Sequence, residues 1–474
     1  MSYRNVGVDL GVTARHQAQV YDEVEKKIAL SFSFHTSKQD MDVLCQKALS
    51  GAYEGTKLRF ICEPTEMSWL PLAIYAKTHN HEIARVKSHK AHDLCRYFAR
   101  HKKNDKFDAR SLSVMPLIDP KAIEPVYLPE AKIFSLERFN RQSKKITDEI
   151  ASAKNRLSSL FHWVMPGLLD CFEDKFDSRA RAFYRKFANP FKAKKTGAEG
   201  IRKVLEPTCR QQMDGDLPEK LYSVALNAYS LYENASPYID FTEIQDEINI
   251  ELELLEAREK VLEKVKERVK DLYQQVHPSK NIETLKGIAE TLGPSFIGII
   301  GNPHRFSSQS KLRCFTGIIP KQDESGETNK KGLSISQEGS SRFRRDLFLA
   351  ADVARQWDPQ LAKVYYDDMV HKGNCHNHAV LSVATKLVNR ILSVLKENRP
   401  YELRDTDGKV ITASAAKRMI KQCFIVPEEI RKRTRSRKSS KNKKEERIHD
   451  LIARQLNASQ NSCSIPPKNI IQNF

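Results

Sequence analysis

The amino-acid sequence predicts an α/β domain at the amino terminus followed by a mostly helical remainder. Three observations lead to this fold class. Short apolar strands alternate with helical segments over the first hundred or so residues, two long heptad repeats follow, and most of the segment 282–401 has helical periodicity. A chain of 474 residues is long enough for two to four domains that each have a core.

The amino-terminal domain, residues 1–125, is predicted from the order of its segments. A buried strand at 5–12 ("NVGVDLGV") is followed by an alternating strand at 26–36 ("KKIALSFSFHT"), which we expect to be its antiparallel neighbour. The order strand, strand, helix, strand, helix, strand, helix is typical of three layers around a mixed sheet. The other expected elements are helices at 37–51, 68–78 and from 105 onward, and strands at 57–63 and 81–87.

Two long helices with coiled-coil periodicity are predicted within residues 130–280. Apolar residues repeat at seven-residue steps between 133 and 164, and again between 241 and 277. Periodicity leaves open whether these helices pair within one chain or between chains. The inserted segment 166–237 interleaves aromatic and basic residues, which either bind a single-stranded nucleic acid or belong to a small helical insertion with its aromatic residues inside. We favour the second interpretation.

The charge of the chain indicates a polyanionic partner. Lys and Arg number 79 against 60 Asp and Glu, a net charge of +19, and this favours nucleic acid because a polyanion relieves the self-repulsion. Basic residues cluster at 85–103 and at 431–447, the second cluster within an expected linker and basic tail at 402–474. No apolar run approaches the length of a membrane span, and the amino terminus lacks the pattern of a secretion signal. We therefore expect a cytoplasmic protein without a membrane partner.

Four acidic residues are candidates for a metal site. Asp9 ends the first predicted strand, Glu63 ends the strand at 57–63, and Asp105 and Asp108 share one face of a helix start. If the two strands are neighbours, the four carboxylates meet at one edge of the sheet. Mg²⁺ or Mn²⁺ would then relieve their repulsion, since these ions prefer oxygen ligands and act on phosphates.

A simpler interpretation of the same residues remains open. Asp9 can be a turn residue, and Asp105 and Asp108 can stabilise the start of a helix. In the metal-site interpretation, basic residues around the two aspartates hold a phosphate backbone. These residues are Lys102, Lys103, Lys106 and Arg110.

The segment 320–347 ("PKQDESGETNKKGLSISQEGSSRFRRDL") is a candidate active-site loop. It contains five serines, and its composition does not distinguish which of them, if any, is a nucleophile. Arg342, Arg344 and Arg345 follow the serines, and arginine can bind phosphate oxygens with two parallel hydrogen bonds.

The chain resembles a known family in two sets of motifs. The first set is "GVDLG", "ICEPTEMSWLPLA" and "KNDKFDARSL"; the second is "RFSSQSKLRCFTGIIPKQDESG" and "LSISQEGSSRFRRDLFLAA". Their order and spacing resemble the DEDD transposases of the insertion-sequence one-ten family, which includes bridge-RNA-guided recombinases and Piv-type DNA invertases. The resemblance covers about residues 5–120 and 282–400. The sequence departs from it at Ala289, where the family usually has the second glycine of a hairpin.

The resemblance implies a fold and a mechanism. The fold is a RuvC/RNase H-like domain, then coiled-coil helices, then a helical transposase domain at 282–401. The implied enzyme cuts and rejoins DNA through a covalent phosphoserine link, with Ser325 as nucleophile and with Mg²⁺ bound by the four acidic residues. The implied partners are double-stranded DNA of the element ends and target, a structured noncoding bridge RNA, and further copies of the chain, as a dimer and as a tetramer in the synaptic complex.

Three other functions remain compatible with the sequence. A RuvC-like metal-dependent nuclease would need the carboxylates but no serine. A site-specific DNA invertase would share all of the protein motifs. A DNA-packaging or RNA-binding protein would need only the charge.

Overall fold

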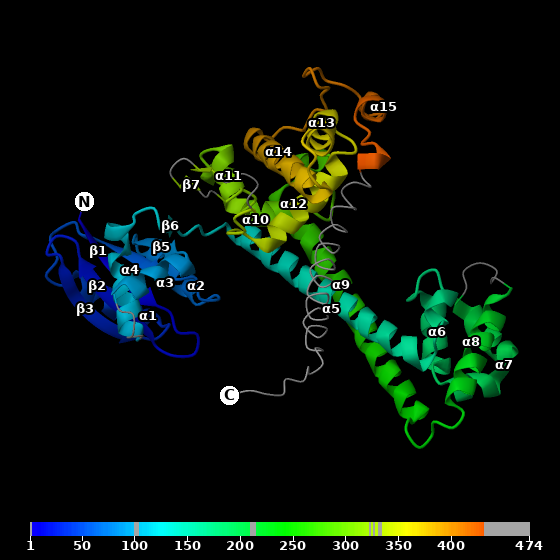
Figure 1. The fold of residues 1–474 in the computed structure, drawn as a ribbon. Helices are drawn as coiled ribbons and strands as arrows, with labels where there is room; N and C mark the ends of the chain where they lie inside the picture. The colour runs from blue at the N-terminus through cyan, green and yellow to red at the C-terminus, as the bar shows by residue number, and fades with distance from the viewer. Residues whose placement is uncertain are drawn as a thin grey trace, which may run out of the picture. The chain divides into compact units, whose positions relative to one another are not determined.

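The computed structural model describes residues 2–98, 104–208, 215–321, 324–325, 328–329 and 334–430. The chain forms two compact units, one from Met1 to Glu130 and one from Ala131 onward, and each is described by itself (Figure 1).

The amino-terminal unit is built on a six-stranded mixed sheet with the order β3-β2-β1-β4-β5-β6. Its three central strands, which are buried along most of their length, run parallel to one another, as near-continuous apolar segments favour. The outer strands pair antiparallel with their neighbours. This sheet confirms the predicted fold class, and it is RNase H-like. The strands are β1 (Tyr3–Asp9), β2 (His16–Asp22), β3 (Lys27–Phe34), β4 (Lys57–Cys62), β5 (Glu82–Val86) and β6 (Ile123–Pro125).

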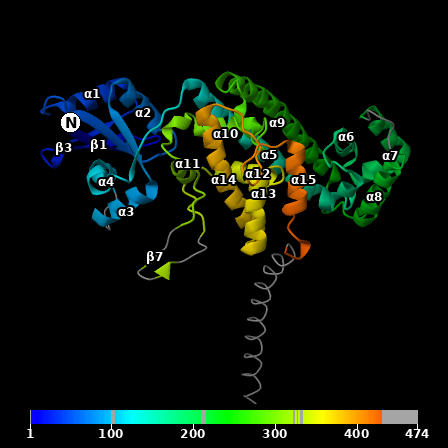
Figure 2. The same cartoon turned by 90° about the horizontal axis from the view of Figure 1, so that it is seen from above.

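Helices cover both faces of this sheet (Figure 2). α1 (Lys38–Leu49) and α2 (Trp69–Thr78) bury their apolar faces against one side of β1, β2 and β4. α3 (Ser88–Phe98) and α4 (Asp105–Ile118) share a smaller core with Ile61 and Val86 on the other side. The unit therefore has the three predicted layers.

One predicted strand pairing is wrong. β3 was expected to lie beside β1, but β2 lies between them and pairs antiparallel with both. β2 carries two glutamines, Gln17 and Gln19, which are more than nine-tenths buried and which make its sequence look like a loop. Their amides donate to the hydroxyl of Ser31 on β3, at 3.2 Å and 2.8 Å, so the buried polar groups are satisfied across the strand pair.

The second unit begins with two long helices that pair within the chain. α5 (Ala131–Val164) and α9 (Phe241–Val276) bury the predicted heptad residues against each other. Arg156 contacts Glu251 while Glu149 contacts Arg258, so the sequence numbers change in opposite directions and the two helices are antiparallel. The question that periodicity left open is answered in favour of pairing within one chain.

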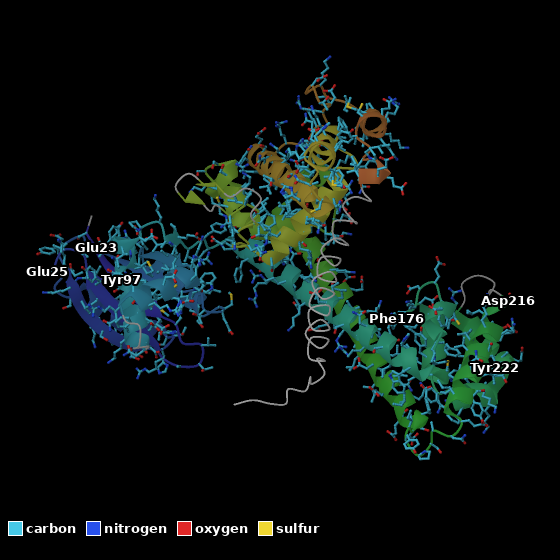
Figure 3. The ribbon with its side chains drawn as sticks, viewed as in Figure 1. Glu23, Glu25, Tyr97, Phe176, Asp216 and Tyr222 are labelled. Carbon is cyan, nitrogen blue, oxygen red and sulfur yellow. The ribbon has the colours of Figure 1, made fainter. Side chains whose placement is uncertain are left out.

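The segment that joins α5 to α9 is a helical insertion with its aromatic residues inside. Phe183 and Tyr184 are fully buried, and Phe176 packs edge-on against Tyr184. Figure 3 shows the position of Phe176 in this segment. Burial of these rings confirms the favoured interpretation of the segment. The elements are η1 (Leu168–Cys171), α6 (Ser178–Phe187), α7 (Pro190–Leu205), η2 (Glu206–Thr208) and α8 (Leu217–Tyr232).

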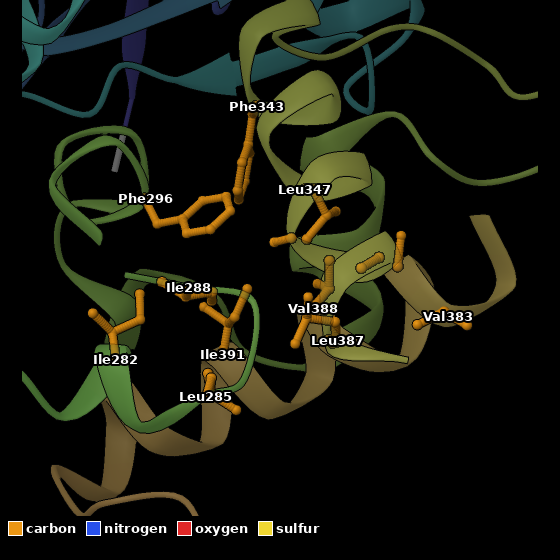
Figure 4. Packing of buried hydrophobic residues seen from close by; sticks show 14 of the residues in the cluster. Ile282, Leu285, Ile288, Phe296, Phe343, Leu347, Val383, Leu387, Val388 and Ile391 are labelled. Atoms are coloured by element: carbon orange, nitrogen blue, oxygen red, sulfur yellow. The ribbon is translucent and has the colours of Figure 1, made fainter. Parts of the chain in front are cut away.

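A helical domain follows α9, with a single large core (Figure 4). Phe296 and Phe343 pack against each other at its centre, and Leu136 of α5 is buried in the same core. Gly287 has φ +88°, and a Cβ there would lie 2.1 Å from the carbonyl oxygen of Ala350, so this turn packs directly on α12. The elements are η3 (Asn281–Thr284), α10 (Gly293–Ile300), η4 (Pro303–Arg305), α11 (Gln309–Thr316), β7 (Glu324–Ser325), β8 (Thr328–Asn329), α12 (Ser341–Ala354), α13 (Pro359–Tyr366), η5 (Asp367–His371), α14 (His376–Glu397) and α15 (Ala413–Cys423).

α14 is the one helix, among the residues the structure describes, with the length and apolar composition to cross a membrane. Its Val383, Leu387 and Ile391 are almost fully buried in the core of the helical domain. Its apolar character is that of a central core helix.

Candidate functional site

Two of the four predicted carboxylates lie at the ends of neighbouring parallel strands. β1 pairs with β4 in a register that places Val8 beside Cys62, so Asp9 and Glu63 are the next residues along the two strands. Both residues are partly exposed, at the carboxyl-terminal edge of the sheet. The condition on which the predicted site depended, adjacency of these two strands, is met.

The other two carboxylates lie in the first turn of α4. Asn104 caps this helix by accepting a hydrogen bond from the Phe107 amide at 2.8 Å. α4 packs on β1 without an intervening side chain, because a Cβ on Gly7 would lie 2.0 Å from the carbonyl oxygen of Ala109. Because Asp108 is the residue before Ala109, this contact determines how far the backbone at Asp108 lies from β1, the strand that ends at Asp9.

Cys95 of α3 shows which of these carboxylates come together. The pKa of its thiol is raised to about 11, mainly by burial; the Ser111 hydroxyl lowers this pKa, and the carboxylates of Asp108 and Glu63 raise it. Glu63 and Asp108 therefore both lie in the neighbourhood of Cys95.

The donor set fits a hard divalent cation, although the side chains do not form a closed cage. Among the described residues, no three His, Cys, Asp or Glu side chains are grouped closely enough to hold a metal ion. Asp105 is exposed, while Glu63 and Asp108 are partly buried. Mg²⁺ is usually held by one or two carboxylates together with substrate phosphates and water, so a pair of carboxylates at an open edge suits it.

The predicted phosphate-binding residues near this edge are exposed where they are described. Lys106 and Arg110 lie on the solvent-facing side of α4. Lys102 and Lys103 lie outside the described residues.

Ser325 lies in the small antiparallel pair β7–β8. It pairs with Thr328, and Glu324 pairs with Asn329. Lys321 donates its backbone amide to Ser334, and Ser336 donates to Ile319, at 2.9 Å and 2.8 Å, which gives this segment an antiparallel base. Figure 2 shows β7 at the end of two extended segments that leave the helical domain. Ser325 thus lies in a short antiparallel pair outside the core of the helical domain. We call the described residues around it, 317–321, 324–325, 328–329 and 334–337, the serine hairpin.

Two other serines of the segment have structural contacts. The Ser340 hydroxyl accepts a hydrogen bond from the Phe343 amide and caps α12. The Ser336 hydroxyl donates to the Gly317 carbonyl at 3.4 Å.

The three arginines after the hairpin are engaged with protein groups. Arg342 is mostly buried and forms an ion pair with Glu137 of α5. Arg344 donates to the carbonyl oxygens of Gly339 at 2.6 Å and Thr316 at 3.4 Å, which joins the two ends of the serine hairpin. Arg345 pairs with the buried Asp346, and 45% of its side chain is exposed. Of the three, Arg345 has the guanidinium most available to a phosphate.

Two residues near the site were not singled out in the sequence. His16 accepts a hydrogen bond from the Gly11 amide at 3.1 Å and contacts Thr36, so it holds the loop that follows Asp9; burial lowers its pKa. Cys95 is one of nine cysteines in the chain. No sequence signal distinguishes either residue, because both act through contacts between segments far apart in the chain.

Comparison with known proteins identifies the family. Residues 6–166 match a DEDD transposase model of the IS110 type, described as "Transposase", and residues 279–366 match the "Transposase IS116/IS110/IS902 family". The chain is 20% identical to the insertion element IS110 uncharacterized 43.6 kDa protein of Streptomyces coelicolor, over 86% of this chain and 98% of the relative. It is 20% identical to the corresponding IS116 protein of Streptomyces clavuligerus, over 84% and 95%.

A shorter match links the chain to DNA inversion proteins. It is 25% identical to the pilin gene-inverting protein of Moraxella lacunata, over 26% of this chain and 38% of the relative. Both family models match in the order in which the two units follow each other, and the DEDD match contains all four candidate carboxylates. The chain belongs to the IS110/IS116/IS902 family of transposases, whose membership implies cleavage and joining of DNA, and it has the DEDD domain of this family at its amino terminus.

Proposed function

We propose that this transposase cuts and rejoins DNA through a covalent link to Ser325, with Mg²⁺ at the carboxylate edge and a structured noncoding RNA as guide. The observation that supports the proposal is the adjacency of the two parallel strands that lead to Asp9 and Glu63, with α4, which carries Asp108, packed directly on β1. All of these residues lie in the part of the chain that matches the DEDD transposase. A nuclease-like edge of this kind has no evident purpose in a protein that only packages DNA.

The chemistry follows from the residue types. The Ser325 oxygen forms a bond to phosphorus, the bond from phosphorus to the departing deoxyribose oxygen breaks, and the serine proton passes to solvent or to a nearby base. Rejoining reverses these steps with a different deoxyribose hydroxyl, and the phosphodiester energy is kept in the phosphoserine bond. Mg²⁺, when bound by Asp9, Glu63, Asp105 and Asp108, would supply charge to the attacked phosphate. Lys106, Arg110 and Arg345 contact neighbouring phosphates.

The two halves of the proposed site belong to separate compact units of the chain. The carboxylates lie in the first unit and the serine hairpin lies in the second. In the proposed oligomer, one copy of the chain supplies the carboxylates of an active site and another copy supplies its serine. The partners in this proposal are double-stranded DNA, a bridge RNA and further copies of the chain in a bacterial cytoplasm.

The test is a covalent adduct. Wild-type protein, guide RNA and DNA of the element ends are incubated with Mg²⁺ and separated on a denaturing gel. We expect a protein–DNA adduct that disappears with EDTA, in Ser325→Ala and in Glu63→Gln. Ser334→Ala is the matched control, because Ser334 lies on the base of the same hairpin and contributes a backbone carbonyl there.

Three results would contradict the proposal in different ways. An adduct that still forms in Ser325→Ala would show that Ser325 is not the nucleophile. Cleavage without any adduct favours a metal-dependent nuclease. An adduct that forms equally well without RNA would show that strand cleavage needs no guide RNA.

DNA inversion is a second candidate function, favoured by the match to pilin gene-inverting proteins. A reporter plasmid separates the two activities, since inversion reverses a segment between two sites whereas transposition joins element ends to a new target.

A further inference from the structure

A groove along the outer face of α5 is lined by cations and phenyl rings. Its first part has a volume of about 550 Å³ and lies over Phe134, Arg138, Arg141 and Lys145, which are three or four residues apart and so share one helix face. Ser135, Phe139 and Gln142 are the other described residues of the lining, and none of the described lining residues is a carboxylate. A second cavity of about 530 Å³ adjoins it, since Arg141 and Lys145 line both.

The phenyl ring of Phe134 is not part of any core. Phe139 packs against both large cores of the second unit, whereas Phe134 belongs to none of the hydrophobic clusters of the described residues. The guanidinium of Arg138 lies 5.9 Å from the Phe134 ring centre, an arrangement that holds the ring at the surface. Phe134 is partly buried and lies outside these cores, so part of its phenyl ring remains accessible over the groove.

The charges of the groove are only partly neutralised. Arg138 has no carboxylate partner among the described residues. Arg141 contacts Glu137 at 2.9 Å, and Lys145 is 4.0 Å from Glu149, both at exposed positions where ion pairs are weak. The described lining of the second cavity adds the cations Lys144 and Arg342 and the carboxylates Asp148 and Glu149. Cations thus exceed carboxylates where the two cavities meet.

We propose that this groove binds unpaired nucleotides of a nucleic acid, with Phe134 stacking on a base and Arg138, Arg141 and Lys145 contacting phosphates. A duplex would present phosphates but no base face to the ring, so the accessible part of the Phe134 phenyl group favours a single strand. The groove from Phe134 to Lys145 is about 16 Å long, the length of a few nucleotides, at 1.5 Å per helical residue. The inference rests on the proposed function only in requiring a nucleic-acid partner, since no step of the serine chemistry involves α5.

The unpaired strand can come from an RNA or from opened DNA, and the experiment includes both. Full-length protein is titrated, without Mg²⁺, into fluorescent oligouridylate, oligothymidylate and a DNA duplex of equal length, and anisotropy is followed at several salt concentrations. Two variants are compared with wild type, Phe134→Ala and Arg138→Ala/Arg141→Ala/Lys145→Ala. Lys264→Ala/Lys266→Ala/Lys270→Ala on the exposed face of α9 is the control with equal loss of charge, and thermal unfolding checks that each variant folds.

We expect Phe134→Ala to weaken binding of the single strands at least fivefold and to leave duplex binding unchanged, because stacking needs an open base. The triple variant should weaken single-strand binding about 10- to 100-fold and reduce the salt dependence of log K by about 2, at about 0.7 for each lost phosphate contact. Tighter binding of oligouridylate assigns the groove to RNA, and tighter binding of oligothymidylate assigns it to an opened DNA strand.

Two results would overturn the proposal. One is that both variants fold and bind single-stranded oligonucleotides with the same affinity as the wild type or the α9 control. The other is an equal loss of duplex and single-strand binding in Phe134→Ala. Because binding is measured without Mg²⁺ or cleavage, neither result bears on adduct formation by Ser325, and loss of the Ser325 adduct does not bear on the groove.

Discussion

Replacing Gly7 by alanine should disable the carboxylate edge without altering any of its carboxylates. The added Cβ would meet three backbone atoms of α4: the Ala109 oxygen at 2.0 Å, the Ser113 nitrogen at 2.3 Å and the Ser113 Cα at 2.9 Å. Backbone atoms cannot rotate away as a flexible side chain can. To reach an ordinary contact of 3.4 Å with Ala109, α4 must retreat from β1 by about 1.4 Å.

The expected magnitudes follow from this displacement. Overpacking of a tight core contact costs about 1–3 kcal/mol, which lowers the unfolding temperature of a unit of this size by about 4–12 °C. Asp108 moves with α4, away from Asp9 and Glu63. A displacement of about 1 Å at a reacting centre can lower the rate about 100-fold, so adduct formation should fall by that order.

The assay combines calorimetry with the adduct gel. Gly7→Ala is compared with Gly215→Ala, where a Cβ would meet nothing within 4 Å, so the control changes the same atoms without a clash. The adduct is measured well below the lowered unfolding temperature. Wild-type stability together with a wild-type adduct rate in Gly7→Ala would refute the argument that α4 rests on β1 at this residue.

Three further outcomes are expected. Arg344→Ala should release the ends of the serine hairpin, so that protease cleaves within 317–337 faster and less adduct forms while the unfolding temperature hardly changes; unaltered proteolysis would contradict the bridging role. Asp368 is nearly fully buried. Burial raises the pKa of its carboxyl group, but hydrogen bonds from Lys372 and Ser382 outweigh this effect and leave the pKa lowered. The contribution of Asp368 to stability is therefore present at neutral pH and is lost as the pH falls below the ordinary carboxyl pKa of about 3.9. Urea unfolding should therefore show Asp368→Asn about 1–3 kcal/mol less stable than wild type at pH 7, with the difference shrinking at pH 3, and a constant difference would refute this. Cys95, with its pKa raised to about 11, should react with iodoacetamide at pH 8 far more slowly than the exposed Cys314, and Asp108→Asn should speed the reaction.

The parts of the fold that were predictable are those with a strong local period. The long heptads of α5 and α9 and the apolar strands around Asp9 and Glu63 repeat every few residues, so local sequence is enough to define them. β2 was missed because its buried glutamines are satisfied by Ser31 on another strand. α3 was missed because its narrow apolar face, Ala91 and Leu94, lies among basic residues that look like a solvated cluster.

In the candidate site, too, residues with a local sequence pattern could be predicted, whereas residues that act through contacts with distant segments could not. Asp9, Glu63 and Asp108 could be proposed from strand ends and a helix start, since each has a local signal. The roles of Gly7, His16 and Arg344 depend on atoms contributed by distant segments, such as the Ala109 carbonyl or the Thr316 carbonyl. The spacing of residues along the chain does not predict such contacts. Ser325 itself was identified only by the resemblance to the transposase family.

The burial of Leu136 has a consequence for how the chain is made. This residue, near the start of α5, is fully enclosed in the core formed by α10 to α14, which emerges from the ribosome more than a hundred residues later. The insertion shares its core with α5 and α9 and can fold first. The carboxyl-terminal helical domain completes its own core only when it packs on the start of α5 and the end of α9, which are made earlier. A fragment that begins after α9 would lack Leu136 and leave this core incomplete, so the shortest self-sufficient version of the serine-bearing domain includes the start of α5.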